Sequence, residues 1–353
     1  MTVYDLLRPI LFSLGPELAH SLTLKGLSLG SRLLPYSNND DSRLAVEALG
    51  LNFSNPLGMA AGFDKNGEVP DALLKLGFGF TEIGTVTPEP QIGNPKPRVF
   101  RLIKDQALIN RLGFNNNGQK RLVDRLKQRP EVKNGSRRIG VIGVNLGANK
   151  ESLDRILDYG AGAKVLSPYA DYLVVNVSSP NTPNLRGLQS AEALSAIINE
   201  VRSSMVKEVP VLVKIAPDLS KNEIEEIAEI ARITSVNGII VSNTTIERPK
   251  NIQDQHKNEE GGLSGNPLFE PSTRVLSQLY QLTKGQTTLI GVGGVGSAED
   301  VLKKIRSGAS LVQLYTALVY KGPGLIKKIK HDLVELLERD GLQNISNAIG
   351  IDV

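Results

Sequence analysis

Apolar, β-branched segments alternate with amphipathic segments along most of the chain, and this alternation constrains the fold more than any other feature. Each apolar segment is short and continuous, as in strands that are buried on both faces. We expect eight such strands, at Leu57–Ala61, Phe80–Val86, Ile139–Leu146, Tyr172–Ser178, Val209–Ile215, Gly238–Ser242, Thr288–Val292 and Ser310–Tyr315. Helical patterns lie between strands, at Glu68–Leu76, Glu192–Val206, Ser220–Ile233, Pro271–Leu282 and Ala298–Ser307.

Eight strands that alternate with helices indicate the α/β class and a parallel sheet with its helices outside. Within roughly 290 residues, this pattern predicts a (β/α)8 TIM barrel. A doubly wound open sheet is the alternative. Against it, the first strand–turn–helix region, Ala60–Gly67, lacks the G-x-G-x-x-G pattern of dinucleotide-binding sheets. A β-hairpin is expected before the barrel, near Val46–Phe53.

Residues 1 to about 36 differ from the rest because they are rich in leucine and form two helical patterns, broken at Gly15-Pro16. We therefore divide the chain into an N-terminal helical extension, residues 1–40, and a barrel domain, residues 41–353. The extension either caps the barrel or inserts into a membrane, and the two roles are compatible. Its charges nearly balance, so any membrane contact would be mainly apolar.

Composition removes several classes of chemistry. The chain has no cysteine, which excludes disulfides, thiolate metal sites, iron–sulfur clusters and a thiol nucleophile. His20, His256 and His331 do not end a predicted barrel strand, and no pair of carboxylates ends neighbouring strands. This argues against imidazole catalysis, glycoside hydrolysis and a metal site.

The net charge of +4 is not gathered into long basic blocks, so we expect a mildly basic surface and no nucleic-acid partner. No segment is apolar over the ~18 residues of a membrane span. The N-terminus lacks the pattern of a secretory signal, and secretion is not expected.

Neutral polar residues follow several predicted strands. The clearest stretch is Asn176-Val177-Ser178-Ser179-Pro180-Asn181, and Asn145 and Asn243-Thr244 occupy similar places. Because barrel enzymes place their chemistry at the carboxyl ends of strands, one pocket would collect these groups. The alternative is a turn whose side chains only cap the backbone. Lys65 and Lys214 would add positive charge, unless Lys214 is merely paired with Asp218.

Two long excursions interrupt the barrel, at residues 87–118 and at Glu247–Gly265. Connections of this length usually carry function, so we expect the first to fold over the barrel mouth. The second is polar and charged. It is either a mobile lid or, over Arg248–Glu260, a disordered surface insertion.

The last two predicted strands carry a phosphate-site pattern. Gly291-Val292-Gly293-Gly294-Val295 lets backbone amides approach an anion, and Ser297 then opens a helix. In barrels, the loops after strands seven and eight often bind phosphate. The ligand would be a phosphorylated substrate or a cofactor such as flavin mononucleotide (FMN).

Several motifs together resemble the dihydroorotate dehydrogenases. They are Ala61–Lys65, Glu82–Pro88, Asn110–Asn116, Asn176–Asn181, Lys214–Asp218 and Gly291–Gly294. The resemblance is to class 2, the quinone-dependent, membrane-associated branch. Ser179 stands where class 1 enzymes have cysteine, and the leucine-rich extension precedes the barrel.

The resemblance implies oxidation of (S)-dihydroorotate to orotate, the fourth step of de novo pyrimidine (UMP) biosynthesis, with one FMN per subunit and a quinone as electron acceptor. It implies that Ser179 is the catalytic base. The residues implied to bind FMN are Ala61, Gly62, Phe63, Asp64, Lys65, Thr85, Asn145, Asn176, Lys214, Ser242, Gly265, Gly294, Tyr315 and Thr316. Those implied to bind dihydroorotate are Lys65, Asn110, Arg111, Leu112, Gly113, Phe114, Asn176, Asn181, Asn243 and Thr244.

The resemblance also implies that His20, Arg101 and Tyr315 lie along the route of the quinone, and that the protein is a monomer held peripherally on the cytoplasmic face of the cell membrane. Two hypotheses of other kinds remain. One is another FMN-dependent barrel oxidoreductase with a different carbonyl substrate. The other is a non-enzymatic barrel that binds a phosphate-bearing ligand.

Overall fold

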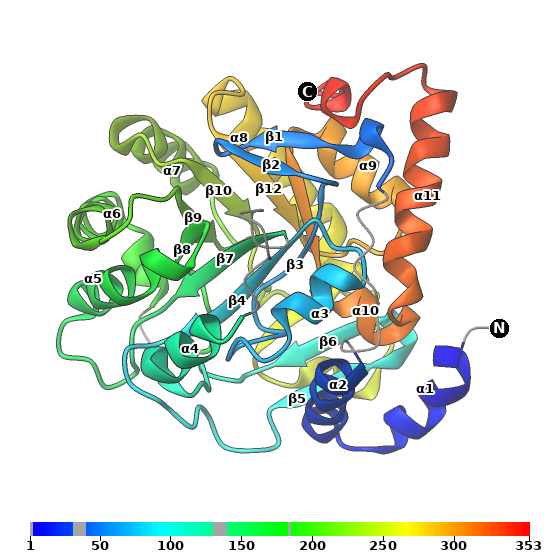
Figure 1. Cartoon of the computed structure of the whole chain (residues 1–353), viewed down its shortest axis with the longest axis horizontal. Helices are drawn as coiled ribbons and strands as arrows, with labels where there is room; N and C mark the ends of the chain where they lie inside the picture. The colour runs from blue at the N-terminus through cyan, green and yellow to red at the C-terminus, as the bar shows by residue number, and fades with distance from the viewer. Residues whose placement is uncertain (1–2, 31–39, 130–139, 183–184) are drawn as a thin grey trace.

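Eight parallel strands close into a barrel in a computed structural model that describes residues 3–30, 40–129, 140–182 and 185–353 (Figure 1). Around the barrel, the strands are β3 (Leu57–Met59), β4 (Phe80–Val86), β7 (Val141–Leu146), β8 (Tyr172–Asn176), β9 (Val211–Ile215), β10 (Gly238–Val241), β12 (Thr288–Val292) and β13 (Leu311–Leu314). The predicted TIM barrel is confirmed, and the open sheet is wrong. The expected start of the third strand, Ile139, lies outside the described residues.

Helices surround the barrel, and five of them fall on the predicted amphipathic segments. They are α3 (Pro70–Lys75), α4 (Gly118–Lys127), α5 (Arg155–Leu166), α6 (Ala191–Ser204), α7 (Lys221–Thr234), α8 (Phe269–Thr283), α9 (Ala298–Arg306), α10 (Thr316–Lys321) and α11 (Gly324–Arg339). Short 3₁₀ turns occur at Ser42–Leu44, Ile103–Asp105, Ser167–Tyr169, Arg186–Gln189, Gln255–Asn258, Asn266–Leu268 and Ile345–Ala348. Local capping fixes several helix starts. At α7, the Ser220 and Glu223 side chains cap each other's backbone amides.

The amino-terminal end of the barrel is closed by the predicted hairpin, formed by β1 (Val46–Ala48) and β2 (Leu51–Phe53). The Phe53 ring packs edge-on against Phe80 at the start of β4, with 5.3 Å between ring centroids. The residues of β4, β7, β8 and β9 are all buried. The carboxyl ends are therefore the open side of the barrel.

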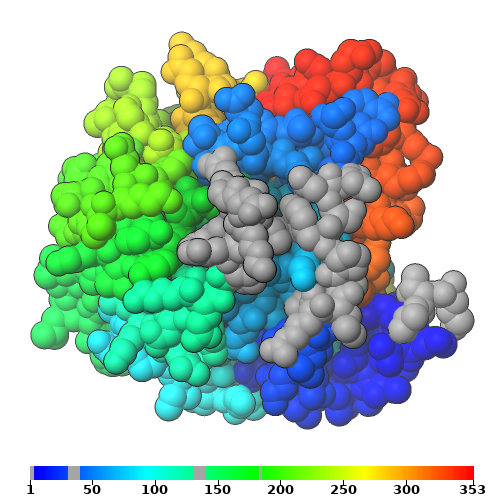
Figure 2. Space-filling view, in the orientation of Figure 1, coloured from blue at the N-terminus to red at the C-terminus, as the bar shows by residue number. Residues whose placement is uncertain are grey.

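The N-terminal extension forms two helices, α1 (Val3–Ser13) and α2 (Pro16–Gly30), which break where Gly15-Pro16 predicts. Both lie along one side of the molecule, next to β5 and α10 (Figures 1 and 2). The Arg98 guanidinium forms an ion pair with Glu17 at 2.9 Å, and Arg101 donates to the backbone carbonyls of Phe12 and Leu14. The extension is therefore packed as a cap; its predicted residues 31–36 lie outside the described residues.

The same two helices expose several large apolar side chains. These are Leu6, Leu7, Ile10, Leu18, Leu22 and Leu29. Within the described residues, no helix is long and apolar enough to cross a membrane.

The two excursions pair with each other, which the sequence did not predict. Strands β5 (Val99–Leu102) and β6 (Ala107–Asn110) come from the first, and β11 (Gly262–Gly265) comes from the second. They form an antiparallel sheet in the order β11-β6-β5. Arg111 and Glu259 add an ion pair at 2.8 Å. Within Arg248–Glu260, Ile252 and Asp254 are buried and Glu259 is ion-paired, so this segment is packed on the sheet and the alternative of a disordered insertion is wrong.

Candidate active site

A cavity of about 920 Å³ lies at the carboxyl ends of the strands, between the barrel, the β11-β6-β5 sheet and helices α1 and α2. Most predicted site residues line it: His20, Ala61, Gly62, Phe63, Lys65, Thr85, Arg101, Asn110, Leu112, Gly113, Phe114, Asn176, Ser179, Asn181, Lys214, Ser242, Asn243, Thr244, Gly265, Gly294, Tyr315 and Thr316. Three predicted residues do not line the cavity: Asp64, Asn145 and Arg111.

The Asp64 carboxylate lies beneath the cavity wall and accepts the backbone N–H groups of Glu68 and Val69 at 2.7 and 2.8 Å. Burial raises the pKa of Asp64 to about 6. Its contacts shape the turn that carries Lys65. Arg111 instead points to the second excursion through its ion pair with Glu259.

A chain of buried hydrogen bonds forms the floor of the cavity. The Asn176 carboxamide donates to the Thr85 hydroxyl at 2.8 Å and to the side-chain oxygen of Asn145 at 3.1 Å. Asn145 in turn donates to the Glu82 carboxylate at 2.7 Å, and Gln313 donates to the same carboxylate at 2.6 Å. Each side chain is thereby held in one orientation, as a preorganised donor set requires.

Lys214 stands beside this floor, opposite Asn176 in the β8–β9 register. Burial lowers the pKa of its ammonium, and the Glu82 carboxylate opposes that effect. Asp218 pairs with Arg186 at 2.9 Å, so the alternative of a Lys214–Asp218 pair is wrong. Within the described residues, the Lys214 ammonium has no carboxylate partner at ion-pair distance. It is placed to meet negative charge on a ligand.

Lys65 offers a second cation on the far side of the cavity. Its ammonium donates to the Asn115 carboxamide oxygen at 2.7 Å. Burial lowers the pKa of Lys65 to about 7, and the nearby Arg98 guanidinium contributes to the lowering. A carboxylate that enters the cavity would favour the charged form.

The two serines after β8 have different surroundings. Ser179 lines the cavity, and its hydroxyl oxygen accepts the Asn181 backbone N–H at 3.3 Å. Ser178 is fully buried, and its hydroxyl donates to the side-chain oxygen of Asn176 at 3.3 Å and accepts from the Asn243 carboxamide at 3.1 Å. Ser179 can reach a ligand, whereas Ser178 orients two carboxamides.

Carboxamides from the excursion and the barrel meet on the wall above Ser179. The Asn181 side chain donates to the side-chain oxygen of Asn110 at 3.2 Å, and the Asn243 side chain donates to the side-chain oxygen of Asn176 at 3.2 Å. These four groups come from two loops, which hold Asn181 and Asn243, and from the ends of strands β6 and β8, which hold Asn110 and Asn176. They offer donors and acceptors to a small planar ligand with several carbonyls.

At the other end of the cavity, the glycine loop after β12 meets the start of α10. Gly294 has a φ of +75°, and a Cβ there would lie 2.5 Å from the Cβ of Phe269. Gly265 approaches from β11 with a φ of +95°, and the Ser264 and Thr316 hydroxyls are 2.8 Å apart. Glycine at 294 is therefore needed for close packing as well as for open space.

This end of the cavity fits the phosphate of FMN. Within the described residues, the backbone N–H groups of Gly294 and Thr316 have no hydrogen-bond acceptor. Both residues line the cavity, and Thr316 opens a helix, where an anion is favoured. The carboxamide floor and Lys214 supply donors and positive charge for a ring system with carbonyls. The residues present therefore suit FMN.

A buried lysine lies behind the glycine loop. The Lys304 ammonium of α9 donates to the Ser272 hydroxyl at 2.7 Å and lies 5.0 Å from the centre of the Phe269 ring. Burial lowers the pKa of Lys304 to about 7, against the opposing effect of Asp300 and Glu270.

Aromatic rings connect the cavity to the extension. The His20 ring lies edge-on to Phe63 at 5.1 Å, and Phe63 lies edge-on to Tyr315 at 5.6 Å. Burial lowers the pKa of His20 to about 4, and the Lys65 ammonium adds to this effect, so the ring is neutral at neutral pH. Arg101 of β5, whose guanidinium donates to the Phe12 carbonyl of α1, also lines this part of the cavity.

Comparison with known families agrees with this geometry. The model of the family described as "Dihydroorotate dehydrogenase" matches residues 43–337, which include all eight barrel strands. The chain belongs to the dihydroorotate dehydrogenase family. The match ends before α11 does, and it begins after the extension.

Curated members of the dihydroorotate dehydrogenase family are similar along the whole chain. A protein of Parvibaculum lavamentivorans named "Dihydroorotate dehydrogenase (quinone)" is 51% identical and covers 100% of this chain and 99% of its own. One of the same name from Rhodospirillum rubrum is 49% identical over 99% of this chain and 94% of its own. The solved ligand-free enzyme of Eimeria tenella has a TM-score of 0.91 and 43% identity, and the match covers 96% of this chain and 99% of that chain.

Several residues that hold the site together were not among the predicted ones. Asn115 orients Lys65, Glu82 anchors the carboxamide floor, and Arg186 contacts the loops behind Ser179. Glu82 gave one signal, a lone carboxylate within an apolar strand. Asn115 lies within the Asn110–Asn116 motif, but its contact with Lys65 spans 50 residues. Arg186 gave no signal, since it lies in no motif and two of its partners, Asp218 and Thr244, are distant in sequence.

Proposed function

We propose that this chain oxidises (S)-dihydroorotate to orotate with FMN as bound cofactor and a membrane quinone as electron acceptor, the fourth step of de novo pyrimidine biosynthesis. One observation carries the proposal: Lys65, Ser179 and the carboxamides converge on the same cavity as the glycine loop and Lys214. The relatives named "Dihydroorotate dehydrogenase (quinone)" support the choice of substrate and acceptor.

The reaction removes a proton from C5 of dihydroorotate and a hydride from C6. When bound, FMN supplies the acceptor for the hydride and later yields the electrons to quinone. Lys65 would pair with the substrate carboxylate and so fix the ring in the cavity. Asn110, Asn176 and Asn243 would donate hydrogen bonds to the ring carbonyls and stabilise enolate character at C5.

Ser179 would take the C5 proton. A serine hydroxyl is a poor base in water, so its surroundings must favour loss of its own proton. Ser179 is 6% exposed, and the Asn181 N–H already donates to its oxygen. Bound substrate would exclude the remaining water and strengthen such interactions.

Lys214 would stabilise the negative charge of the reduced cofactor. Its pKa is lowered by burial, and a new anion nearby would favour the protonated form. Glu82 lies behind it and keeps the carboxamide floor fixed, so little reorganisation would accompany the charge change.

Helices α1 and α2 would give the quinone its entrance. Residues of both helices line the cavity, and the exposed leucines of these helices suit the apolar tail of a quinone and the surface of a bilayer. Neutral His20 and the rings of Phe63 and Tyr315 would line the route. The protein would act as a monomer, bound peripherally to the cytoplasmic face of the cell membrane.

The first test is the identity of the cofactor and its response to product. The purified protein should release one FMN per chain on denaturation, and orotate should shift the absorbance of the bound flavin. A stoichiometric FMN that responds to neither dihydroorotate nor orotate would favour an oxidoreductase for another carbonyl substrate. A folded, colourless protein that takes up no FMN would favour a non-enzymatic binding barrel.

A further inference from the structure

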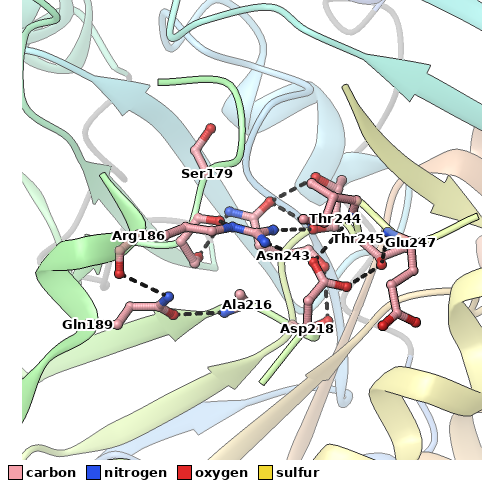
Figure 3. A network of polar contacts seen from close by, with 12 residues as sticks. Ser179, Arg186, Gln189, Ala216, Asp218, Asn243, Thr244, Thr245 and Glu247 are labelled. Atoms are coloured by element: carbon pink, nitrogen blue, oxygen red, sulfur yellow. Dashed lines mark hydrogen bonds and ion pairs between the residues drawn. The ribbon is translucent and has the colours of Figure 1, made fainter. Parts of the chain in front are cut away.

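Arg186 contacts two active-site loops and an acidic side chain of a third. It lies in the 3₁₀ turn Arg186–Gln189, a few residues after Ser179. Its guanidinium donates to the Ser178 carbonyl at 3.2 Å, to the Thr244 carbonyl at 3.2 Å and to the Asp218 carboxylate at 2.9 Å (Figure 3). These acceptors come from the loops after β8, β10 and β9, respectively.

Asp218 extends the same connection. Its carboxylate accepts the Thr245 hydroxyl and the Ile246 backbone N–H, the latter at 3.1 Å (Figure 3). A parallel link runs through Gln189, whose carboxamide oxygen accepts the Ala216 N–H at 3.0 Å. The loops after β8, β9 and β10 are thus joined side to side behind the cavity.

The loops after β8 and β10 each carry a residue of the proposed chemistry next to the contact with Arg186. Ser178 precedes Ser179, and Thr244 follows Asn243. Arg186 itself does not line the cavity. Its side chain is 24% exposed and that of Asp218 is 10% exposed, so water screens this ion pair less than it would a pair on the open surface. A planar guanidinium fixes several acceptors at once, which an ammonium cannot do.

We propose that Arg186, held by Asp218, is a positioning residue that sets the Ser179 hydroxyl for proton abstraction. This inference rests on the proposed function. Its contact with the Ser178 carbonyl fixes the backbone one residue before the base, and its contact with the Thr244 carbonyl fixes that backbone against the loop after β10. A displacement of about 1 Å in a reacting group can cost about 10²-fold in rate.

The test measures anaerobic flavin reduction by dihydroorotate in the full-length flavoprotein. Arg186→Gln should lower the rate at saturating substrate about 10- to 100-fold. Flavin content and the rate of reoxidation by quinone should stay near wild type, because neither depends on Ser179. Asp218→Asn, which weakens the hold on Arg186, should give a smaller loss in the same step.

Arg202→Gln is the matched control. Arg202 is another half-buried arginine that donates to two backbone carbonyls, those of Thr234 and Ser235, at the amino-terminal end of the barrel. It should lose stability without a selective loss of flavin reduction. A purely structural role for Arg186 would make its variants behave like Arg202→Gln.

A double variant separates this inference from the proposed function. If Arg186 acts through Ser179, then Arg186→Gln should cost less than about threefold further when Ser179 is already alanine. Wild-type flavin reduction by Arg186→Gln, or equal losses in reduction and reoxidation, would overturn the inference. If Arg186→Gln does not fold, Arg186→Lys decides, and a reduction rate within about threefold of wild type overturns it. A wild-type protein that dihydroorotate cannot reduce overturns the proposed function instead.

Discussion

Replacement of Ser179 by alanine separates proton abstraction from ligand binding. The change removes one hydroxyl from the cavity wall and leaves Lys65, Lys214 and the glycine loop in place. In the described part of the chain, the Ser179 oxygen takes part in a single weak hydrogen bond, from the Asn181 N–H at 3.3 Å. Its loss as an acceptor should cost about 1 kcal/mol or less.

A lost general base should cost much more than a lost hydrogen bond. General base catalysis contributes roughly 10²–10⁴-fold to a rate, which corresponds to a decrease of about 3–5 kcal/mol in the activation free energy. We therefore expect Ser179→Ala to slow anaerobic flavin reduction by that factor at neutral pH. FMN content and orotate affinity should change less than about fivefold. Stopped-flow absorbance of the flavin measures the rate directly.

Ser178→Ala is the comparison variant, because Ser178 is buried and orients Asn176 and Asn243. Its loss should weaken ligand binding by about tenfold at most and slow reduction much less than Ser179→Ala. Ser179→Cys should retain more activity than alanine, since a thiol ionises more readily than a hydroxyl. If Ser179→Ala reduces its flavin at the wild-type rate, or if Ser178→Ala is the slower variant, the assignment of the base is wrong.

Three further predictions follow from charges and exposed surfaces. Burial lowers the pKa of Lys65 to about 7 in the ligand-free protein, and only its ammonium pairs with a carboxylate, so orotate affinity should fall about tenfold per pH unit above that value. Titrations that follow the flavin absorbance check this, and Lys65→Met should remove the dependence of orotate affinity on pH. Leu18→Glu and Leu22→Glu should lower binding to lipid vesicles and quinone-dependent turnover, while flavin reduction by dihydroorotate persists. The control Leu153→Glu, at an exposed position distant from the extension, should change neither vesicle binding nor quinone-dependent turnover. Equal vesicle binding by all three variants would contradict the proposed membrane contact. Burial lowers the pKa of Lys304 from 10.5 to about 7, so between these values the unfolded chain binds a proton that the folded chain does not, and stability is lost as the pH falls through that range. Thermal unfolding should therefore show Lys304→Met to be more stable than wild type at pH 7, by a few kcal/mol at most, and the difference should shrink towards pH 10. A difference that stays constant with pH would show that Lys304 is charged in the folded protein.

The barrel was predictable from sequence because its strands are buried on both faces and so read as continuous apolar segments. Phe80–Val86 and Thr288–Val292 have the same bounds in the structure as in the prediction. The pairing of β6 with β11 was not predictable, since the two strands are about 150 residues apart and each is only four residues long. Their register depends on the folded barrel that brings them together.

The candidate site divides in the same way. Residues at strand ends, such as Asn176 and Lys214, reach the cavity because the fold places every carboxyl end on one side. Contacts behind the cavity, such as those of Arg186 with Asp218, join residues from different loops and have no periodic pattern. Such residues are identified only when the loops are seen together.

The central claim is that one cavity takes electrons from dihydroorotate and delivers them to a quinone. Anaerobic mixing of the purified flavoprotein with dihydroorotate tests it most directly. The flavin absorbance should bleach with release of one orotate per flavin, and a short-chain quinone added next should restore the absorbance without oxygen. A bound flavin that stays oxidised in excess dihydroorotate would contradict the claim, and so would a bleached flavin that quinone cannot reoxidise.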